Sequence, residues 1–254
     1  MPYSAAAIAA LFVDAHTRGH QFEAATDSSP ATAEVAYQIQ DRIFAALHPG
    51  QRGGAWKVGG SRPGVEPTAA PIPSARLHAS PARVPAREFH MIGIESEIAF
   101  RLGRDLPPRA APYAEAEIAA AVTEALVTIE LCDTRLSNWK DTSALWRLAD
   151  FQLNAALIVG SGRQDWRSID FSRQRAELWI DGALNKEATG GHPYGDPIRL
   201  LPWLAAHCMA RGGGLRAGDI ITTGSWTGMQ FVTPGAEVTA RFPGIGEASV
   251  TLQQ

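Results

Sequence analysis

The sequence predicts an α+β fold, because helical patterns come early in the chain and short strand patterns come late. Residues 4–18 and 31–47 carry apolar side chains at helical spacing. Further along, most apolar runs are short, and several alternate with polar residues as strands do. The chain has 254 residues, which suits one large domain or one domain with an appended cap. We expect an N-terminal helical cap with a proline-rich connection at residues 1–88, and a β-rich domain at residues 89–254.

The individual elements follow from local patterns. A short strand is predicted at residues 53–58, before a glycine-rich turn at residues 59–64. Six prolines between residues 62 and 88 predict an irregular segment that is neither a helix nor a central strand. Asp181 and Gly182 mark a hairpin turn. The other expected helical stretches are 114–126, 143–154 and 196–211, and the other expected strands are 89–101, 126–133, 155–160, 175–179, 183–189, 219–223, 237–242 and 248–252.

The composition argues against several classes of protein. The formal net charge is −3, so no basic surface favours binding to nucleic acid or to an anionic membrane. No apolar run approaches the roughly 18 residues of a membrane-spanning helix. The start lacks the positive residues of a secretion signal, and we expect it to form the first helix. The two cysteines, Cys132 and Cys208, are far apart in the sequence, so a reducing cytoplasm is expected.

Two glutamates, Glu95 and Glu97, lie on a largely apolar run at residues 91–100 whose side chains alternate in character. Such alternation predicts a half-buried strand, and side chains two positions apart point to the same face. The two carboxylates would therefore stand side by side, about 7 Å apart at Cβ. Like charges so placed repel unless a positive charge lies between them. A hard divalent cation, which prefers oxygen ligands, would fill this role.

A second alternating run at residues 126–133 carries Glu130. If the two strands are neighbours, Glu95, Glu97 and Glu130 could occupy one side of an octahedral cation. Three positions would remain open for water or a chelating substrate. The alternative is a strand face that is simply exposed to water, which is the commoner arrangement. Cys132 shares the parity of Glu130, so it either lies near this site or serves as a small buried apolar residue.

Nine short segments together resemble, in order and along nearly the whole chain, the 2-keto-4-pentenoate hydratase branch of the fumarylacetoacetate hydrolase superfamily. This branch also includes 2-oxohept-3-ene-1,7-dioate hydratase and 2-oxo-3-hexenedioate (4-oxalocrotonate) decarboxylase. No single segment is decisive, but the ordered set is a strong joint signal. The matching segments are Ala36–Gln40, Trp56–Gly59, Gly93–Phe100, Ile129–Arg135, Ala149–Asp150, Gly191–Pro193, Leu215–Ile220, Thr223–Ser225 and Phe242–Gly246.

The resemblance implies a mixed β-roll core with an N-terminal cap, and a homo-oligomeric enzyme. It implies that Glu95, Glu97 and Glu130 hold a divalent metal, Mg²⁺ or Mn²⁺. Lys57, in the cap segment, matches the lysine of the family's Trp/Tyr-Lys-Ile/Val-Gly motif. We expect it to move protons, since burial and a nearby cation both lower a lysine pKa. Asp150 is the second candidate acid or base; its alternative role is that of a helix-terminal or loop carboxylate.

Two segments depart from the family's pattern, and both bear on the choice of substrate. Where many hydratases carry Asp-Asn-Ala-Ser, this chain has Phe151, Gln152 and Leu153 after Asp150. Small residues after Lys57 also replace a bulkier apolar residue. Five positions in or just after the matching segments are expected to contact the substrate, with a plain turn as the alternative for the last two. These residues are Gly59, Ser61, Asn154, Thr223 and Ser225.

The resemblance implies an enzyme that acts on a small unsaturated 2-keto acid. We expect hydration of a substrate of the 2-hydroxypenta-2,4-dienoate type, in the meta-cleavage catabolism of aromatic compounds. Decarboxylation of 2-oxo-3-hexenedioate is the alternative, because it would use the same metal and the same lysine. Hydrolysis of an acylpyruvate C–C bond ranks lower, since the cap lacks the His-Glu pair of that branch. A metal-stabilised binding protein ranks lower too, since Lys57 accompanies all three carboxylates.

Overall fold

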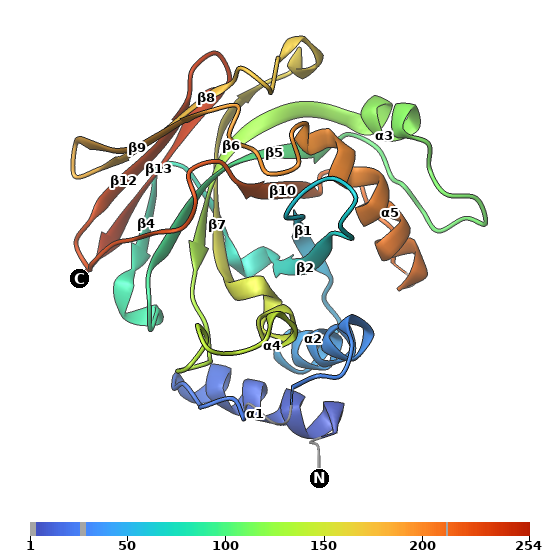
Figure 1. Cartoon of the computed structure of the whole chain (residues 1–254), viewed down its shortest axis with the longest axis vertical. Coiled ribbons are helices and arrows are strands. Elements are labelled where there is room, and N and C mark those ends of the chain that lie inside the picture. The colour runs from blue at the N-terminus through green and yellow to red at the C-terminus, as the bar shows by residue number, and fades with distance from the viewer. Residues whose placement is uncertain (1–3, 26–28, 212) are drawn as a thin grey trace.

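Two curled β-sheets form the centre of this computed structural model, and helices cover one end and one side of it (Figure 1). The structure describes residues 4–25, 29–211 and 213–254. Both sheets are mixed, since each combines parallel and antiparallel strand pairs. The α+β class predicted from the sequence is therefore confirmed.

The larger sheet has eight strands. They are β1 (Gly53–Gly59), β2 (Thr68–Pro73), β3 (Leu77–Ala79), β5 (Gly93–Leu102), β6 (Val122–Cys132), β7 (Asn154–Arg163), β10 (Ile220–Ser225) and β11 (Gln230–Phe231). Their order is β2-β1-β10-β5-β6-β7-β3, with β11 paired to β5. The smaller sheet has the order β4-β13-β12-β8-β9. Its strands are β4 (Ala82–Pro85), β8 (Arg175–Ile180), β9 (Ala183–Thr189), β12 (Glu237–Phe242) and β13 (Gly246–Gln253).

The first two helices end where the sequence predicts and begin one and two residues later than predicted. Ser4 caps the first helix by accepting a hydrogen bond from a backbone amide, and Gly19 ends it in a left-handed conformation. Thr32 caps the second helix in the same way. The α-helices are α1 (Ala5–Arg18), α2 (Ala33–Leu47), α3 (Glu115–Ala121), α4 (Ala144–Ala149) and α5 (Leu201–Ala210). Short 3₁₀ turns are η1 (Ser74–Arg76), η2 (Ala86–Glu88), η3 (Phe151–Leu153), η4 (Trp166–Ser168) and η5 (Pro197–Leu200).

The prediction of an irregular segment at residues 62–88 is wrong, because β2, β3 and β4 all lie within it. Each of these strands is at the edge of a sheet, where proline removes no hydrogen bond that a neighbouring strand needs. The prediction that the segment contains no central strand therefore agrees with the structure. Strands β1, β3 and β4 pair with strands beyond residue 88. The division into a cap and a β-rich domain at that residue stays a prediction.

The helix predicted at residues 114–126 is too long. It ends at Ala121, and β6 begins at Val122. Val122 and Thr123 are β-branched, which favours the strand, and the alanine-rich stretch before them favours the helix. The result is an eleven-residue strand that runs the length of the larger sheet.

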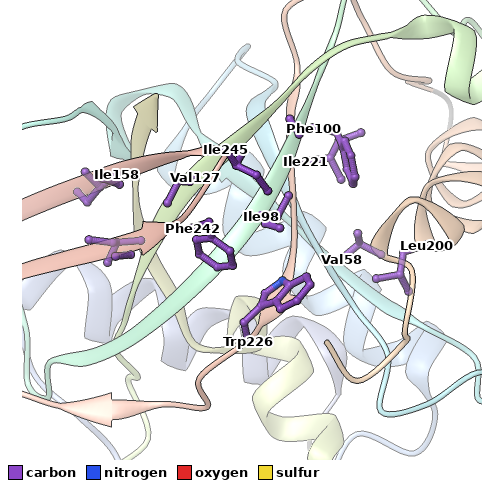
Figure 2. Packing of buried hydrophobic residues seen from close by; sticks show 14 of the residues in the cluster. Val58, Ile98, Phe100, Val127, Ile158, Leu200, Ile221, Trp226, Phe242 and Ile245 are labelled. Atoms are coloured by element: carbon purple, nitrogen blue, oxygen red, sulfur yellow. The ribbon is translucent and has the colours of Figure 1, made fainter. Parts of the chain in front are cut away.

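The main core lies between the two sheets (Figure 2). Val58 on β1, Ile98 on β5 and Val127 on β6 lie on the same side of the larger sheet and point into this core, where Phe242 of β12 meets them. Because strand side chains alternate, the neighbouring residues on these strands point to the other face. That other face carries the charged residues described below.

A second cluster joins α1, α2 and α4 at one end of the larger sheet (Figure 1). Phe12 is fully buried, and its ring centroid lies 5.0 Å from that of Phe22 and 6.0 Å from that of Trp146. These aromatic contacts attach α1 to the segment around α4, which leads into β7.

No helix in the described ranges combines the length and the apolar character needed to cross a membrane. Cys132 and Cys208 are buried free thiols in the described part of the chain. A cytoplasmic location and a homo-oligomeric state stay predictions.

Replacing Phe12 by alanine should lower the free energy of unfolding by about 3–5 kcal/mol, because the smaller side chain leaves a cavity among the neighbouring aromatic rings. Leu11→Ala is the matched control, since Leu11 is the next residue on α1 and is 39% exposed. The control should change stability by no more than about 0.5 kcal/mol. Urea denaturation followed by tryptophan fluorescence measures both; equal losses would contradict this account of the cap.

Candidate metal centre

The two strands that carry glutamates are neighbours, as a shared metal site requires. β5 and β6 pair antiparallel, with Glu95 opposite Glu130 and Glu97 opposite Thr128. Side chains at directly opposed positions point to the same face of a sheet. All three carboxylates therefore lie on one face, as the alternating patterns predict.

The face that carries the carboxylates is buried, and so is the opposite face, which packs into the core. Glu97 and Glu130 are 0% exposed, and the side chain of Glu95 is 15% exposed. The other face of β5 packs into the core through Ile98 and Phe100. The prediction of a half-buried strand and the alternative of a water-exposed carboxylate face are both wrong. Burying like charges is costly unless positive charge compensates them.

Lys57 supplies positive charge within the cluster. It projects from β1 and is 8% exposed. Its Nζ donates to Glu130 Oε1 at 2.7 Å and to the carbonyl oxygen of Gln152 at 3.2 Å, and it lies 3.6 Å from Glu95 Oε2. Since β10 lies between β1 and β5, the lysine reaches over one strand to carboxylates on the next two.

The charges in this cluster are unbalanced, since three carboxylates surround one ammonium group. Burial is the main cause that raises the pKa of Glu95, Glu97 and Glu130, and for Glu130 the pKa reaches about 7. Burial alone would lower the pKa of Lys57, but Glu130 and Glu95 raise it well above its usual value. Without a cation the two carboxylates thus outweigh burial, and the expectation that burial and a nearby cation together lower the Lys57 pKa stays a prediction.

Donors from β10 orient Glu97. The Thr222 hydroxyl and the Gly224 amide both donate to Glu97 Oε2, the amide at 2.8 Å. Thr222 Oγ1 also lies 3.1 Å from Thr128 Oγ1. Thr222, Gly224 and Thr128 were not among the predicted site residues. Thr128 could have been found, because it shares the parity of Glu130 on its strand.

Two buried carboxylate oxygens, Glu97 Oε1 and Glu130 Oε2, have no hydrogen-bond partner among the described residues. An unpaired buried acceptor costs about 1–3 kcal/mol, and more if it is charged. Glu95, Glu130 and Cys132 each place one possible ligand atom within 4.8 Å of the other two. Among the described residues, Glu97 is not part of this group. The unpaired oxygens and the convergence of donor atoms fit a divalent cation.

Asp150 is anchored away from the carboxylates. Its Oδ2 accepts from the Thr134 hydroxyl at 2.6 Å and from the Arg135 amide at 2.9 Å, and its Oδ1 accepts from Arg135 Nε at 2.9 Å. Burial raises the pKa of Asp150, although Arg135 opposes the shift. Within the described ranges no hydrogen bond joins Asp150 to Lys57 or to the three glutamates. The geometry gives it a positioning role, and a catalytic role for Asp150 stays a prediction.

The segment that departs from the family's pattern forms an unusual left-handed turn. Phe151, Gln152 and Leu153 have φ values of 51°, 55° and 66°. Non-glycine residues in this region cost of order 1–3 kcal/mol each and persist where other contacts hold them. The turn presents the Gln152 carbonyl to Lys57, and the next residue, Asn154, donates from Nδ2 to Glu130 Oε1 at 3.0 Å.

The expected substrate-binding residues differ in their surroundings. Asn154 contacts Glu130, so it orients a carboxylate. Thr223 donates its hydroxyl to a backbone carbonyl at 2.6 Å. Ser225 pairs with Glu97 in the β10–β5 register, and its buried Oγ lacks a hydrogen-bond partner in the described part of the chain. Ser61 is exposed in a turn, and Gly59 ends β1. Substrate contact by these five residues stays a prediction.

A cavity of about 270 Å³ adjoins this cluster through Asn154. It lies between α1 and the larger sheet, and its lining includes His16, His90, Asp133 and Arg135. Asn154 therefore lines the cavity and also donates a hydrogen bond to Glu130.

Comparison with known proteins agrees with this architecture. The profile described as Fumarylacetoacetate (FAA) hydrolase C-terminal matches residues 65–253. A 2-keto-4-pentenoate hydratase from Burkholderia vietnamiensis (strain G4 / LMG 22486) is 28% identical, over 99% of this chain and 98% of that protein. A second 2-keto-4-pentenoate hydratase, from Paraburkholderia phymatum, is 27% identical over 91% of this chain and 89% of that protein.

A solved structure shares the whole fold. It is 4-oxalocrotonate decarboxylase from Pseudomonas putida G7, complexed with magnesium and adipate. The TM-score is 0.85 at 22% identity, over 98% of this chain and 97% of that one. The expected β-roll fold is thus confirmed. Since the matched profile also spans most of the sequence, the chain belongs to the fumarylacetoacetate hydrolase family.

Proposed function

We propose that this protein is a hydro-lyase that adds water to an unsaturated 2-keto acid of the 2-hydroxypenta-2,4-dienoate type, in the catabolism of aromatic compounds by meta cleavage. It uses a divalent metal, Mg²⁺ or Mn²⁺. The observation that carries the proposal is a lysine hydrogen-bonded to one of three buried carboxylates, two of which keep an unpaired oxygen. Similarity to hydratases over nearly the full length supports the choice of reaction.

Glu95, Glu97 and Glu130 would hold the metal. A divalent cation bound there supplies Lewis acidity, which stabilises negative charge on the 2-oxo group of a chelating substrate. Glu97 is oriented by Thr222 and Gly224. Glu130 is oriented by Lys57 and Asn154, both of which contact Oε1 and leave Oε2 available.

Lys57 would move protons between the enol and keto forms of the substrate. The Gln152 carbonyl and Glu130 fix the position of its Nζ. When Glu130 and Glu95 share their negative charge with a cation, they stabilise the Lys57 ammonium less, and its pKa falls. The lysine can then release and regain a proton closer to neutral pH.

Decarboxylation of 2-oxo-3-hexenedioate is the second candidate. The solved decarboxylase with the same fold supports it, and that protein was crystallised with magnesium and adipate, a dicarboxylate. Both reactions need the same lysine and carboxylates. They differ at the distal end of the substrate, where a hydratase must deliver water and a decarboxylase must release CO2. Hydrolysis of an acylpyruvate is a weaker candidate.

The direct test is incubation of the magnesium-loaded protein with 2-hydroxypenta-2,4-dienoate and, separately, with 2-oxo-3-hexenedioate. We expect the ultraviolet absorbance of the first compound to disappear without release of CO2. Loss of absorbance of the second compound with release of CO2 would instead assign decarboxylation. Turnover of neither compound would contradict the proposed reaction.

Lys57→Met should reduce turnover by about 10²- to 10⁴-fold, the usual contribution of a general acid–base group. Metal should still bind, and more tightly, because the competing ammonium group is gone. Lys186→Met is the control, since Lys186 is exposed on β9 and should leave turnover unchanged. Steady-state kinetics and titration calorimetry measure the two effects. A Lys57→Met protein with undiminished turnover would exclude the proposed role.

Glu130→Gln should weaken binding of Mn²⁺ by at least about tenfold, since even partners beyond the ligands are commonly worth 10- to 100-fold in metal affinity. Glu124→Gln is the matched control on the same strand, because Glu124 pairs with Arg101 away from the cluster. Titration calorimetry of both variants provides the comparison. Equal affinities in the two variants would show that Glu130 is not a ligand.

A further inference from the structure

Cys132 lies against the metal-binding carboxylates and has no role in the proposed hydration. It is fully buried at the end of β6, two residues after Glu130. Its thiol donates a hydrogen bond to Glu95 Oε2, with Sγ and Oε2 3.7 Å apart. A cysteine that served only as a small apolar residue would pack among apolar side chains, whereas this thiol faces a carboxylate in a cluster of charges.

The spacing of these atoms matches shared coordination of one ion. For a tetrahedral site with metal–oxygen bonds of about 2.1 Å and metal–sulfur bonds of about 2.3 Å, the oxygen and sulfur ligands are about 3.6 Å apart. The observed separation of 3.7 Å between Cys132 Sγ and Glu95 Oε2 is close to this value. One carboxylate oxygen of Glu130 lies within 4.8 Å of the ligand atoms of both residues.

Glu130 gives a second, independent indication of a ligand. It is 0% exposed, and its Oε2 has no hydrogen-bond partner among the residues that the structure describes. Lys57 and Asn154 both contact the other oxygen, Oε1. An ion at Oε2 would therefore satisfy this buried acceptor and leave the lysine contact in place.

Gly93 makes room for the thiol on the facing strand. Gly93 pairs with Cys132 in the β5–β6 register, and a Cβ at this position would lie 3.0 Å from Cys132 Cβ and 2.9 Å from Met229 Sδ. Any side chain at residue 93 would push against both sulfur-bearing residues. The glycine thus allows Cys132 to keep its place beside Glu95.

We propose that the same pocket also binds thiophilic divalent cations, such as Zn²⁺ or Co²⁺, through Glu95, Glu130 and the Cys132 thiolate. The proposal rests on the proposed metal site and extends its range of ions. Binding replaces the thiol proton, which passes to solvent, and forms a metal–sulfur bond without any change of oxidation state. Mg²⁺, which prefers oxygen, would gain nothing from the sulfur. The pocket therefore discriminates between hard and soft cations through a single side chain.

The test is the absorption spectrum of the protein titrated with Co²⁺. A thiolate ligand produces an intense near-ultraviolet charge-transfer band, which oxygen ligands do not. We expect this band in the wild-type protein and in Cys208→Ser, and its loss in Cys132→Ser. Cys208 is the matched control, because it is the other buried free thiol and lies on α5. Calorimetry should show Zn²⁺ binding weakened by about tenfold or more in Cys132→Ser, and Mg²⁺ binding changed by less than about threefold.

The outcomes separate this inference from the proposed function. Co²⁺ binding without the band, or a band that persists in Cys132→Ser, would overturn the role of Cys132 and leave the oxygen-only site intact. Loss of the band in Glu130→Gln as well as in Cys132→Ser would support one shared site. A band lost only in Cys208→Ser would place the thiolate ligand on α5 and refute the proposal. Failure of the hydration assay would have no effect on these spectra.

Discussion

The structure around the candidate site depends on one electrostatic constraint, which is that three buried carboxylates share a single ammonium group. Even with Lys57 fully charged, two negative charges remain in a region with almost no contact with water. Proteins avoid uncompensated buried charge because its desolvation is costly. A divalent cation would balance those two charges. Burial, and to a lesser degree the neighbouring carboxylates, raises the pKa of these carboxyl groups, since protonation is the other way to remove the buried charge.

The fold makes this arrangement possible by covering both faces of β5. One face carries Ile98 and Phe100 into the core between the sheets (Figure 2). The other face carries Glu95 and Glu97 towards Lys57. The apolar face fixes the strand, because a shift of one residue would move every side chain to the opposite face. The energy that positions the carboxylates therefore comes from the core behind them. The polar contacts from β10 and β7 then set the orientation of Glu97 and Glu130.

The alternating patterns were enough to predict that Glu95 and Glu97 share a face, since parity along a strand is a local property. That Glu130 joins them depends on the pairing of β5 with β6, which the patterns alone did not give. The resemblance added Lys57, which lies 73 positions from Glu130 along the chain. Local patterns did not predict that the carboxylate face is buried, because its cover comes from distant segments. Thr222 was missed for a related reason: the β10–β5 register shifts between Thr222 and Ser225, so simple alternation does not place both residues correctly. Predicting the direction of the Lys57 pKa shift also requires knowing how many carboxylates lie near its ammonium group.

The left-handed turn at residues 151–153 explains how Asp150 affects the site without touching it. The backbone amide of Leu153 donates to the Asp150 carbonyl, and the Asp133 amide donates to the Leu153 carbonyl, both at 2.9 Å. The Asp150 carboxylate is held by Thr134 and Arg135, on the segment that follows β6. These contacts oppose the strain of three consecutive positive φ values and aim the Gln152 carbonyl at Lys57. The geometry thus gives Asp150 a positioning role through the turn that carries the Gln152 carbonyl, and a catalytic role for it stays a prediction.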